Sequence, residues 1–139
     1  MNTSEKGDAS EAAVISKLKL IGIEVSIPFG DSARYDIIID DGSELLRTQV
    51  KTATERKSSD TITFNCYTDS YKNGGERNTK SYTPDEIDGY AVYSPSLDEC
   101  YWVPVEDSPS SKMTLRYSGD MSHHRTNNAS NYLLTERFK

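Results

Sequence analysis

An acidic, an amide and a basic residue in one short stretch have side chains that could handle a metal ion and a phosphate. Asp36 opens the apolar run 36–40, and the run 44–52 carries Gln49 and, two residues later, Lys51. Carboxylate and amide oxygens are ligands for Mg²⁺, and an ammonium group can stabilise a phosphate that gains negative charge. The stretch therefore holds the groups that hydrolysis of a phosphodiester bond requires.

A β-hairpin would bring these side chains together. The Asp-Gly pair at 41–42 lies between two strand-like runs and is a strong hairpin signal. Because side chains alternate between the faces of a strand, Gln49 and Lys51 share one face. With the turn at 42–43, Asp36 lies opposite Gln49, and with a turn one residue earlier the two are diagonal. Either register gathers all the groups at the open end of the hairpin.

A helix is expected over residues 8–21, and it would bring a second carboxylate to the hairpin. Its apolar residues follow helical spacing, and they are Ala12, Ile15, Leu18 and Ile21, with Val14 beside them. Glu11 heads the same stripe, and a carboxylate on a buried face needs a partner. Both interpretations of Glu11 stay open: it joins the metal region, or it caps the helix start with Asp8 as the N-cap.

These residues suggest a division of roles in a magnesium site. Asp36 is the best candidate for the central ligand, and the Gln49 amide oxygen and the Val50 backbone carbonyl could complete the protein's share. Glu11 reaches the same region if the helix packs across the hairpin. Lys51 could orient the attacking water or stabilise the transition-state phosphate. From the residues alone, an ordinary surface ion pair between Asp36 and Lys51 is the commoner explanation.

The charge distribution indicates where nucleic acid could bind. The net charge is -6, but residues 71–82 are locally basic, with Lys72, Arg77 and Lys80. The segment 69–82 is rich in glycine, asparagine and serine, which predicts an exposed loop or a mobile hairpin. A locally basic surface on an acidic protein can hold a phosphate backbone. Arg34 could be a phosphate contact or a plain surface charge.

The bulk properties suit one domain over residues 1–139, because a chain of 139 residues can bury most of its core surface. No apolar run is long enough for a transmembrane span, and no signal peptide is recognisable, so we expect a cytoplasmic protein without a membrane partner. Cys66 and Cys100 are too few for a disulfide framework and are expected to be buried. His123 and His124 lack a matching pair at zinc spacing.

The rest of the chain alternates strand-like runs and turns. Strands are expected over 23–27, 61–67, 89–93 and 100–105, a short helix over 106–112, and a final helix or strand over 131–138.

Glu11, Asp36 and the triplet 49–51 resemble the core of the PD-(D/E)XK nuclease superfamily: a helix glutamate, a strand aspartate and an acid-x-lysine on the next strand. The surrounding sequence is similar to the group I intron-associated, homing-type branch of that superfamily. The similar segments are 7–14, 27–30, 34–36, 46–52, 88–93 and 101–105.

The resemblance implies an α/β restriction-endonuclease-like core, with a mixed central β-sheet flanked by helices. It also implies magnesium-dependent cleavage of double-stranded DNA by a homo-oligomer, a dimer or a tetramer. The resemblance also implies that Glu11, Asp36 and Gln49 belong to the metal site and that Lys51 acts on the nucleophile.

The sequence departs from the superfamily pattern at Tyr35, where the name-giving proline would stand, and at Gln49, which replaces the acid. The intron-associated branch carries glutamine there, so we expect an active enzyme. Alternatives are a Holliday junction resolvase of the same fold and a DNA-binding module without catalysis. Gln49 and the net charge of -6 both disfavour the resolvase.

Overall fold

The structure is a computed structural model that describes residues 1–71, 74–119 and 127–139. Lys72, His123 and His124 therefore lie outside the described residues. The helices are α1 (Thr3–Leu20) and α2 (Leu134–Arg137), with 3-10 turns at Lys57–Ser59, Val105–Asp107 and Ala129–Tyr132. The strands are β1 (Glu24–Ser26), β2 (Ile37–Asp40), β3 (Leu45–Thr52), β4 (Thr54–Arg56), β5 (Thr61–Asn65), β6 (Tyr67–Tyr71), β7 (Arg77–Ser81), β8 (Gly89–Ser94), β9 (Glu99–Pro104), β10 (Lys112–Arg116) and β11 (Asn127–Asn128).

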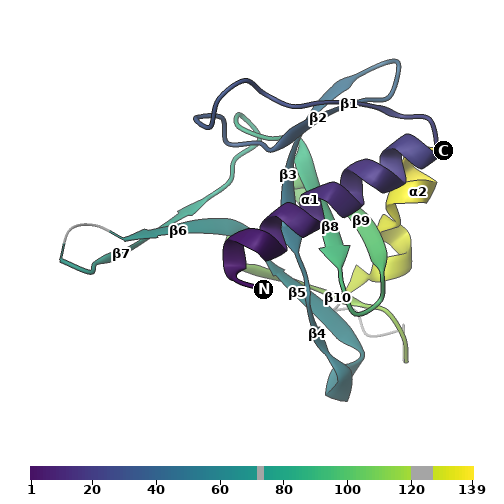
Figure 1. The fold of residues 1–139 in the computed structure, drawn as a ribbon. Coiled ribbons are helices and arrows are strands. Elements are labelled where there is room, and N and C mark those ends of the chain that lie inside the picture. Colours follow the sequence, from purple (N-terminus) through teal and green to yellow (C-terminus); the bar gives the residue numbers. More distant parts are fainter. Residues whose placement is uncertain (72–73, 120–126) are drawn as a thin grey trace.

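A mixed sheet with the strand order β1-β2-β3-β8-β9 forms the centre of the protein. β3 lies in its middle, antiparallel to β2 and parallel to β8. α1 crosses one face of this sheet over β3, β8 and β9, and α2 lies beside the C-terminal end of α1 (Figure 1). The expected mixed α/β architecture is thus confirmed. The other face packs against a second sheet with the order β11-β10-β5-β4, which the sequence analysis did not foresee.

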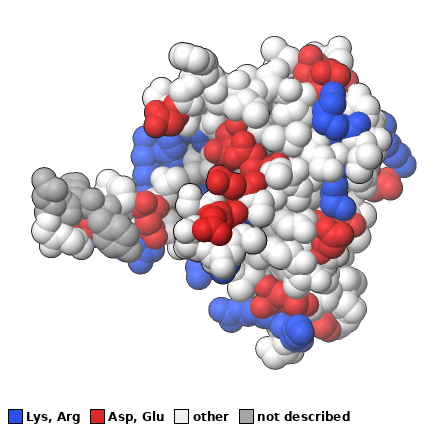
Figure 2. Space-filling model, in the orientation of Figure 1, with Lys and Arg blue, Asp and Glu red and all other residues white. Residues whose placement is uncertain are grey.

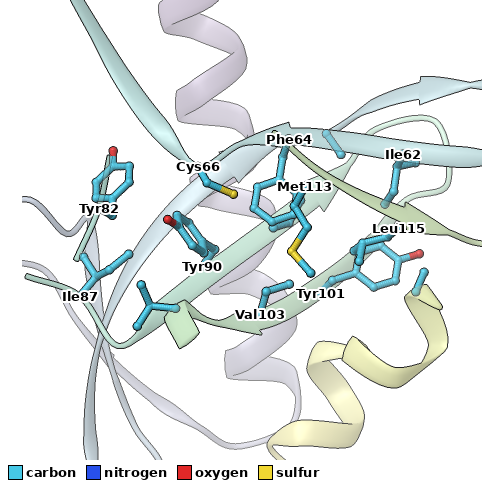
Figure 3. Packing of buried hydrophobic residues seen from close by; sticks show 14 residues of the cluster. Ile62, Phe64, Cys66, Tyr82, Ile87, Tyr90, Tyr101, Val103, Met113 and Leu115 are labelled. Carbon is cyan, nitrogen blue, oxygen red and sulfur yellow. The ribbon is translucent and has the colours of Figure 1, made fainter. Parts of the chain in front are cut away.

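Each face of the central sheet has its own apolar core. On the α1 face, Val14 and Leu18 are fully buried against Ile37 and Ile39 of β2. Full burial of one such side chain contributes about 1.5–3 kcal/mol. On the opposite face, Figure 3 shows aromatic and sulfur-containing side chains packed between the two sheets. β3 is thus held from both sides, which fixes the strand that carries Gln49 and Lys51.

The inward stripe of α1 differs from the one expected. Ser10, Val14 and Leu18 are its buried residues, at a spacing of four, whereas Ala12 is exposed and Ile21 keeps 37% of its surface exposed. The helix also begins earlier, because the Asn2 side chain accepts a hydrogen bond of 2.8 Å from the Glu5 N–H. The interpretation of Asp8 as the N-cap is therefore wrong.

The hairpin of β2 and β3 has the register that places Asp36 opposite Gln49. Asp40 pairs with Leu45, so the turn lies at 42–43. The Asp41 carboxylate accepts backbone hydrogen bonds from both residues that follow Gly42, which adopts a left-handed φ of 94°. Turn chemistry and strand pairing therefore select one register of the two that the sequence allows.

A second hairpin, formed by β6 and β7, extends away from the body of the protein (Figure 1). Residues 69–82 were expected to be a loop or a hairpin, and the hairpin is the correct alternative. The expected helix at 106–112 is wrong, because a single 3-10 turn ends at Asp107 and β10 starts at Lys112. Cys66 and Cys100 are buried free thiols, as expected. Among the described residues, no helix is long and apolar enough to cross a membrane.

Candidate active site

Asp36 is fixed by the strand beside it. It lies directly before β2, and its Oδ2 accepts a hydrogen bond of 2.9 Å from the Val50 N–H. A strand residue points its N–H and its C=O toward the same neighbour, so the Val50 carbonyl also faces the Asp36 side. Burial raises the pKa of Asp36, although the Val50 hydrogen bond and the Lys51 charge act in the opposite direction.

Lys51 shares a face of β3 with the half-buried Gln49, as predicted. Its Nζ donates a hydrogen bond of 3.1 Å to the Tyr67 carbonyl and lies 5.0 Å from the centre of the Tyr82 ring. Burial lowers the pKa of Lys51, while the Asp36 carboxylate raises it. The Lys51 ammonium is therefore partly buried and lies near the Asp36 carboxylate.

Glu11 is brought to Asp36 by the packing of α1 on β3. The hydroxyls of Ser10 and Thr52, each one residue away from Glu11 or Lys51, share a hydrogen bond of 2.5 Å. A cleft of about 230 Å³ is lined by Glu11, Ile27, Pro28, Gly30, Asp31, Ala33, Tyr35 and Asp36. Burial raises the pKa of Glu11, and repulsion by Asp36 and then by Asp8 raises it further.

This cleft suits a divalent cation. The Asp36 carboxylate raises the pKa of Glu11, and a bound cation would offset this repulsion. Throughout 1–71, 74–119 and 127–139, no three His, Cys, Asp or Glu side chains form a group that could hold a metal. A metal bound to Glu11 and Asp36 would therefore need further ligands with neutral oxygens, and the Gln49 amide and the Val50 carbonyl lie on the same hairpin as Asp36.

Only some of the residues predicted to bind DNA lie near the cleft of Glu11 and Asp36. Arg34 forms an ion pair of 3.2 Å with Glu86, and its Cζ lies 4.1 Å from the centre of the Tyr82 ring. Lys80 also reaches Glu86, at 3.4 Å. Figure 2 shows acidic side chains over the first half of α1 and basic side chains beside them, at the base of the β6–β7 hairpin.

Arg77 lies farther out on the hairpin, where its Nε donates to the Asp69 carboxylate at 3.2 Å. Lys72 is outside the described residues. The described basic residues of the hairpin, Arg77 and Lys80, thus have acidic partners. Arg34 shares the Tyr82 ring with Lys51. Arg77 lies 6.0 Å from the ring of Tyr67, whose carbonyl accepts the Lys51 hydrogen bond.

The sequence analysis missed Tyr82 and Glu86. Burial raises the pKa of Glu86, but the charges of Arg34 and Lys80 together with the hydrogen bonds from Thr83 lower it more, so the net shift of the pKa is downward. Tyr82 is buried next to the catalytic candidates although it stands far from Lys51 in the chain. No local spacing links them, and only the fold brings them together.

Comparison with known proteins identifies the family and the fold of this chain. The sequence pattern of one protein family, described as PD-(D/E)XK endonuclease, matches residues 1–135. The fold is similar to the solved structure of a bacterial homing endonuclease, with a TM-score of 0.80 and 22% sequence identity over 99% of this chain and 92% of the other. No curated protein matches the chain. The expected restriction-endonuclease-like fold is thereby confirmed.

Proposed function

This chain belongs to the PD-(D/E)XK endonuclease family, and on that premise we propose that it is a magnesium-dependent endonuclease that hydrolyses phosphodiester bonds in double-stranded DNA. We further propose that it is a site-specific enzyme of the homing type, as its structural neighbour is. The observation that carries the proposal is the meeting of Glu11 and Asp36 in one cleft, with Lys51 beside Asp36 on the same hairpin.

Four groups would hold the metal: the carboxylates of Glu11 and Asp36, the Gln49 amide oxygen and the Val50 carbonyl. When bound, Mg²⁺ supplies positive charge against the reacting phosphate and lowers the pKa of water. The Val50 N–H keeps the Asp36 carboxylate oriented. Lys51 either orients the attacking water or stabilises the additional negative charge on the phosphate as the bond to the leaving oxygen breaks.

The β6–β7 hairpin is proposed to contact the DNA. It projects from the body beside the cleft, and it carries Arg77 and Lys80 on β7 and Lys72 next to the described part. Arg34, at the base of the hairpin, is proposed as a further phosphate contact. Each of these basic residues would attract the phosphate backbone near the cleft, where the acidic side chains alone would repel it.

Two-strand cleavage is proposed to require a homo-oligomer, a dimer or a tetramer. The strands of a duplex run in opposite directions, and a two-fold symmetric assembly presents one cleft to each. Large apolar side chains at the surface that do not line the cleft, among them Leu20 (83% exposed) and Leu45 (67%), are available for contacts between copies. Light scattering over a concentration series measures the assembly.

The decisive experiment incubates the purified protein with a randomised duplex pool, a supercoiled plasmid and a four-way junction, each in Mg²⁺ and in EDTA. Lys51→Ala serves as the matched inactive control. We expect cleavage of duplex DNA in Mg²⁺ only, with sequenced ends that share one site. Cleavage restricted to the junction would indicate a resolvase, and binding without cleavage in Mg²⁺ or Mn²⁺ would indicate a DNA-binding module.

A further inference from the structure

Tyr82 presents a fixed aromatic face next to the active site. It follows β7 directly and keeps only 7% of its surface exposed. Its ring packs edge-on against the ring of Tyr90, with centres 5.6 Å apart and planes at 87°. Figure 3 shows Tyr82 at the border of the core that also contains Tyr90 and Cys66. The core therefore sets the orientation of this ring.

Two cations lie over this ring. The Arg34 Cζ is 4.1 Å and the Lys51 Nζ is 5.0 Å from its centre. The negative face of an aromatic ring attracts a cation at distances of up to about 6 Å from the ring centre, and both cations lie within this range. Arg34 and Lys51 repel each other, so the ring and the Glu86 carboxylate, which pairs with Arg34 at 3.2 Å, keep both in place.

The same cations contact both strands of the β6–β7 hairpin at its base. Lys51 Nζ donates to the Tyr67 carbonyl on β6 at 3.1 Å. The Arg34 guanidinium donates to Thr68 Oγ1 on β6 at 3.4 Å and to the Lys80 carbonyl on β7 at 3.5 Å. The direction of the Lys51 side chain is thus set by the hairpin that we propose to contact DNA.

We propose that Tyr82 is a positioning residue for catalysis: its ring face seats the Lys51 ammonium and, through Arg34, joins the base of the β6–β7 hairpin to the active site. This inference rests on the proposed function. Tyr82 itself does not contact the reacting atoms. Tyr82 acts by holding the Lys51 side chain in the orientation that catalysis requires. A misplaced catalytic group loses most of its effect.

The test compares the wild type with four variants in single-turnover cleavage at saturating DNA, with DNA affinity measured separately in EDTA. Tyr82→Phe keeps the ring face, Tyr82→Leu removes it, and a pentafluorinated phenylalanine at position 82 keeps the shape but cancels the negative charge of the face. Tyr101→Leu is the matched control, because Tyr101 is buried in the same core cluster on β9.

We expect Tyr82→Leu and the fluorinated ring to cleave about 10- to 100-fold more slowly, with DNA affinity within about twofold of wild type. Tyr82→Phe should cleave within about threefold of wild type, and Tyr101→Leu should lose stability but not its rate. If Tyr82→Leu does not fold, the fluorinated protein decides, because it preserves the volume of the ring.

Three outcomes overturn the inference. Tyr82→Leu or the fluorinated protein could cleave like Tyr101→Leu, which would make Tyr82 an ordinary core residue. Tyr82→Phe could be as slow as Tyr82→Leu, which would assign the effect to the hydroxyl. A wild type that is inert in Mg²⁺ overturns the proposed function and this inference together, whereas the first two outcomes leave the proposed function intact.

Discussion

The Asp36 carboxylate accepts a hydrogen bond of 2.9 Å from the backbone N–H of Val50. This bond joins the start of β2 to the strand that carries Lys51, so the two charged groups keep a fixed relation. It uses one of the lone pairs of the carboxylate and leaves the others for a cation. The strand pairing thus orients the Asp36 carboxylate before any cation binds.

Removal of either charged group should abolish cleavage and leave the fold intact. We expect Asp36→Ala and Lys51→Ala to cleave at least about 10³-fold more slowly, because neither side chain supports the apolar core. DNA affinity and the melting temperature should stay near wild type. The controls Asp85→Ala and Lys57→Ala remove the same charges outside the cleft. Wild-type cleavage by either active-site variant refutes the assignment.

The stability of the protein should depend on pH through Glu11 and Asp36. Both pKa values are raised in the folded state, chiefly by burial. The folded protein therefore binds protons more readily than the unfolded chain, and its stability falls as the pH rises from about 4 through the raised folded pKa values. In the double variant Glu11→Gln/Asp36→Asn, the free energy of unfolding should no longer fall over this pH range. Urea unfolding at a series of pH values measures it. A wild-type profile in the double variant contradicts the origin assigned here.

Mg²⁺ should stabilise the wild type against thermal unfolding without any DNA present. A ligand at free concentration c that binds only the folded state stabilises it by RT ln(1 + c/Kd), so the melting temperature rises with the Mg²⁺ concentration. The Glu11→Gln/Asp36→Asn variant should show no such rise, because its cleft lacks both anionic ligands. An equal rise in both proteins would place the metal elsewhere.

Gln49→Glu should lower the magnesium concentration for half-maximal cleavage, since hard cations favour charged oxygens. Without metal, a third carboxylate beside Glu11 and Asp36 should destabilise the protein at neutral pH through repulsion. A magnesium titration of activity and melting temperature measures both effects. An inert wild type beside an active Gln49→Glu variant would instead show that the natural protein has lost catalysis.

The hairpin should contribute to the salt dependence of DNA binding. Each phosphate contact adds about 0.9 to the slope of log affinity against log salt, so Arg77→Ala/Lys80→Ala should flatten the slope, and Lys72→Ala should flatten it further. The matched control is Lys19→Ala/Lys139→Ala, whose lysines also have acidic partners, Glu24 and Glu136. Equal slopes in both double variants would give the hairpin another role.

The sequence predicts those parts of the site that local rules determine. The Asp-Gly turn and the strand period place Gln49 and Lys51 on one face, and the structure has the same arrangement. The helix and part of its inward face were assigned correctly, because Val14 and Leu18 are buried. Ala12 and Ile21 were wrongly included, and the small polar Ser10, which packs inside, was missed.

The rest depends on contacts between distant segments. Tyr82 contacts Lys51 although β4, β5, β6 and β7 lie between them in the chain. The second sheet could not be predicted from the sequence either. Its strands β4, β5 and β10 are short, and their pairing depends on long-range packing. Propensity and spacing carry no information on which of several half-buried strands meet.

The contacts of Lys51 with Tyr67 and Tyr82 also have a consequence for protein synthesis, because both tyrosines are synthesised after Lys51. A ribosome releases residues 11–51, with every charged group proposed for the cleft, before the two residues that hold the lysine in place. Domains emerge from the N-terminal end and fold as their contacts become available. A nascent chain that ends before Tyr82 lacks one of the two contacts that hold Lys51 in place. We therefore expect the proposed active site to be completed only after the β6–β7 hairpin has been synthesised.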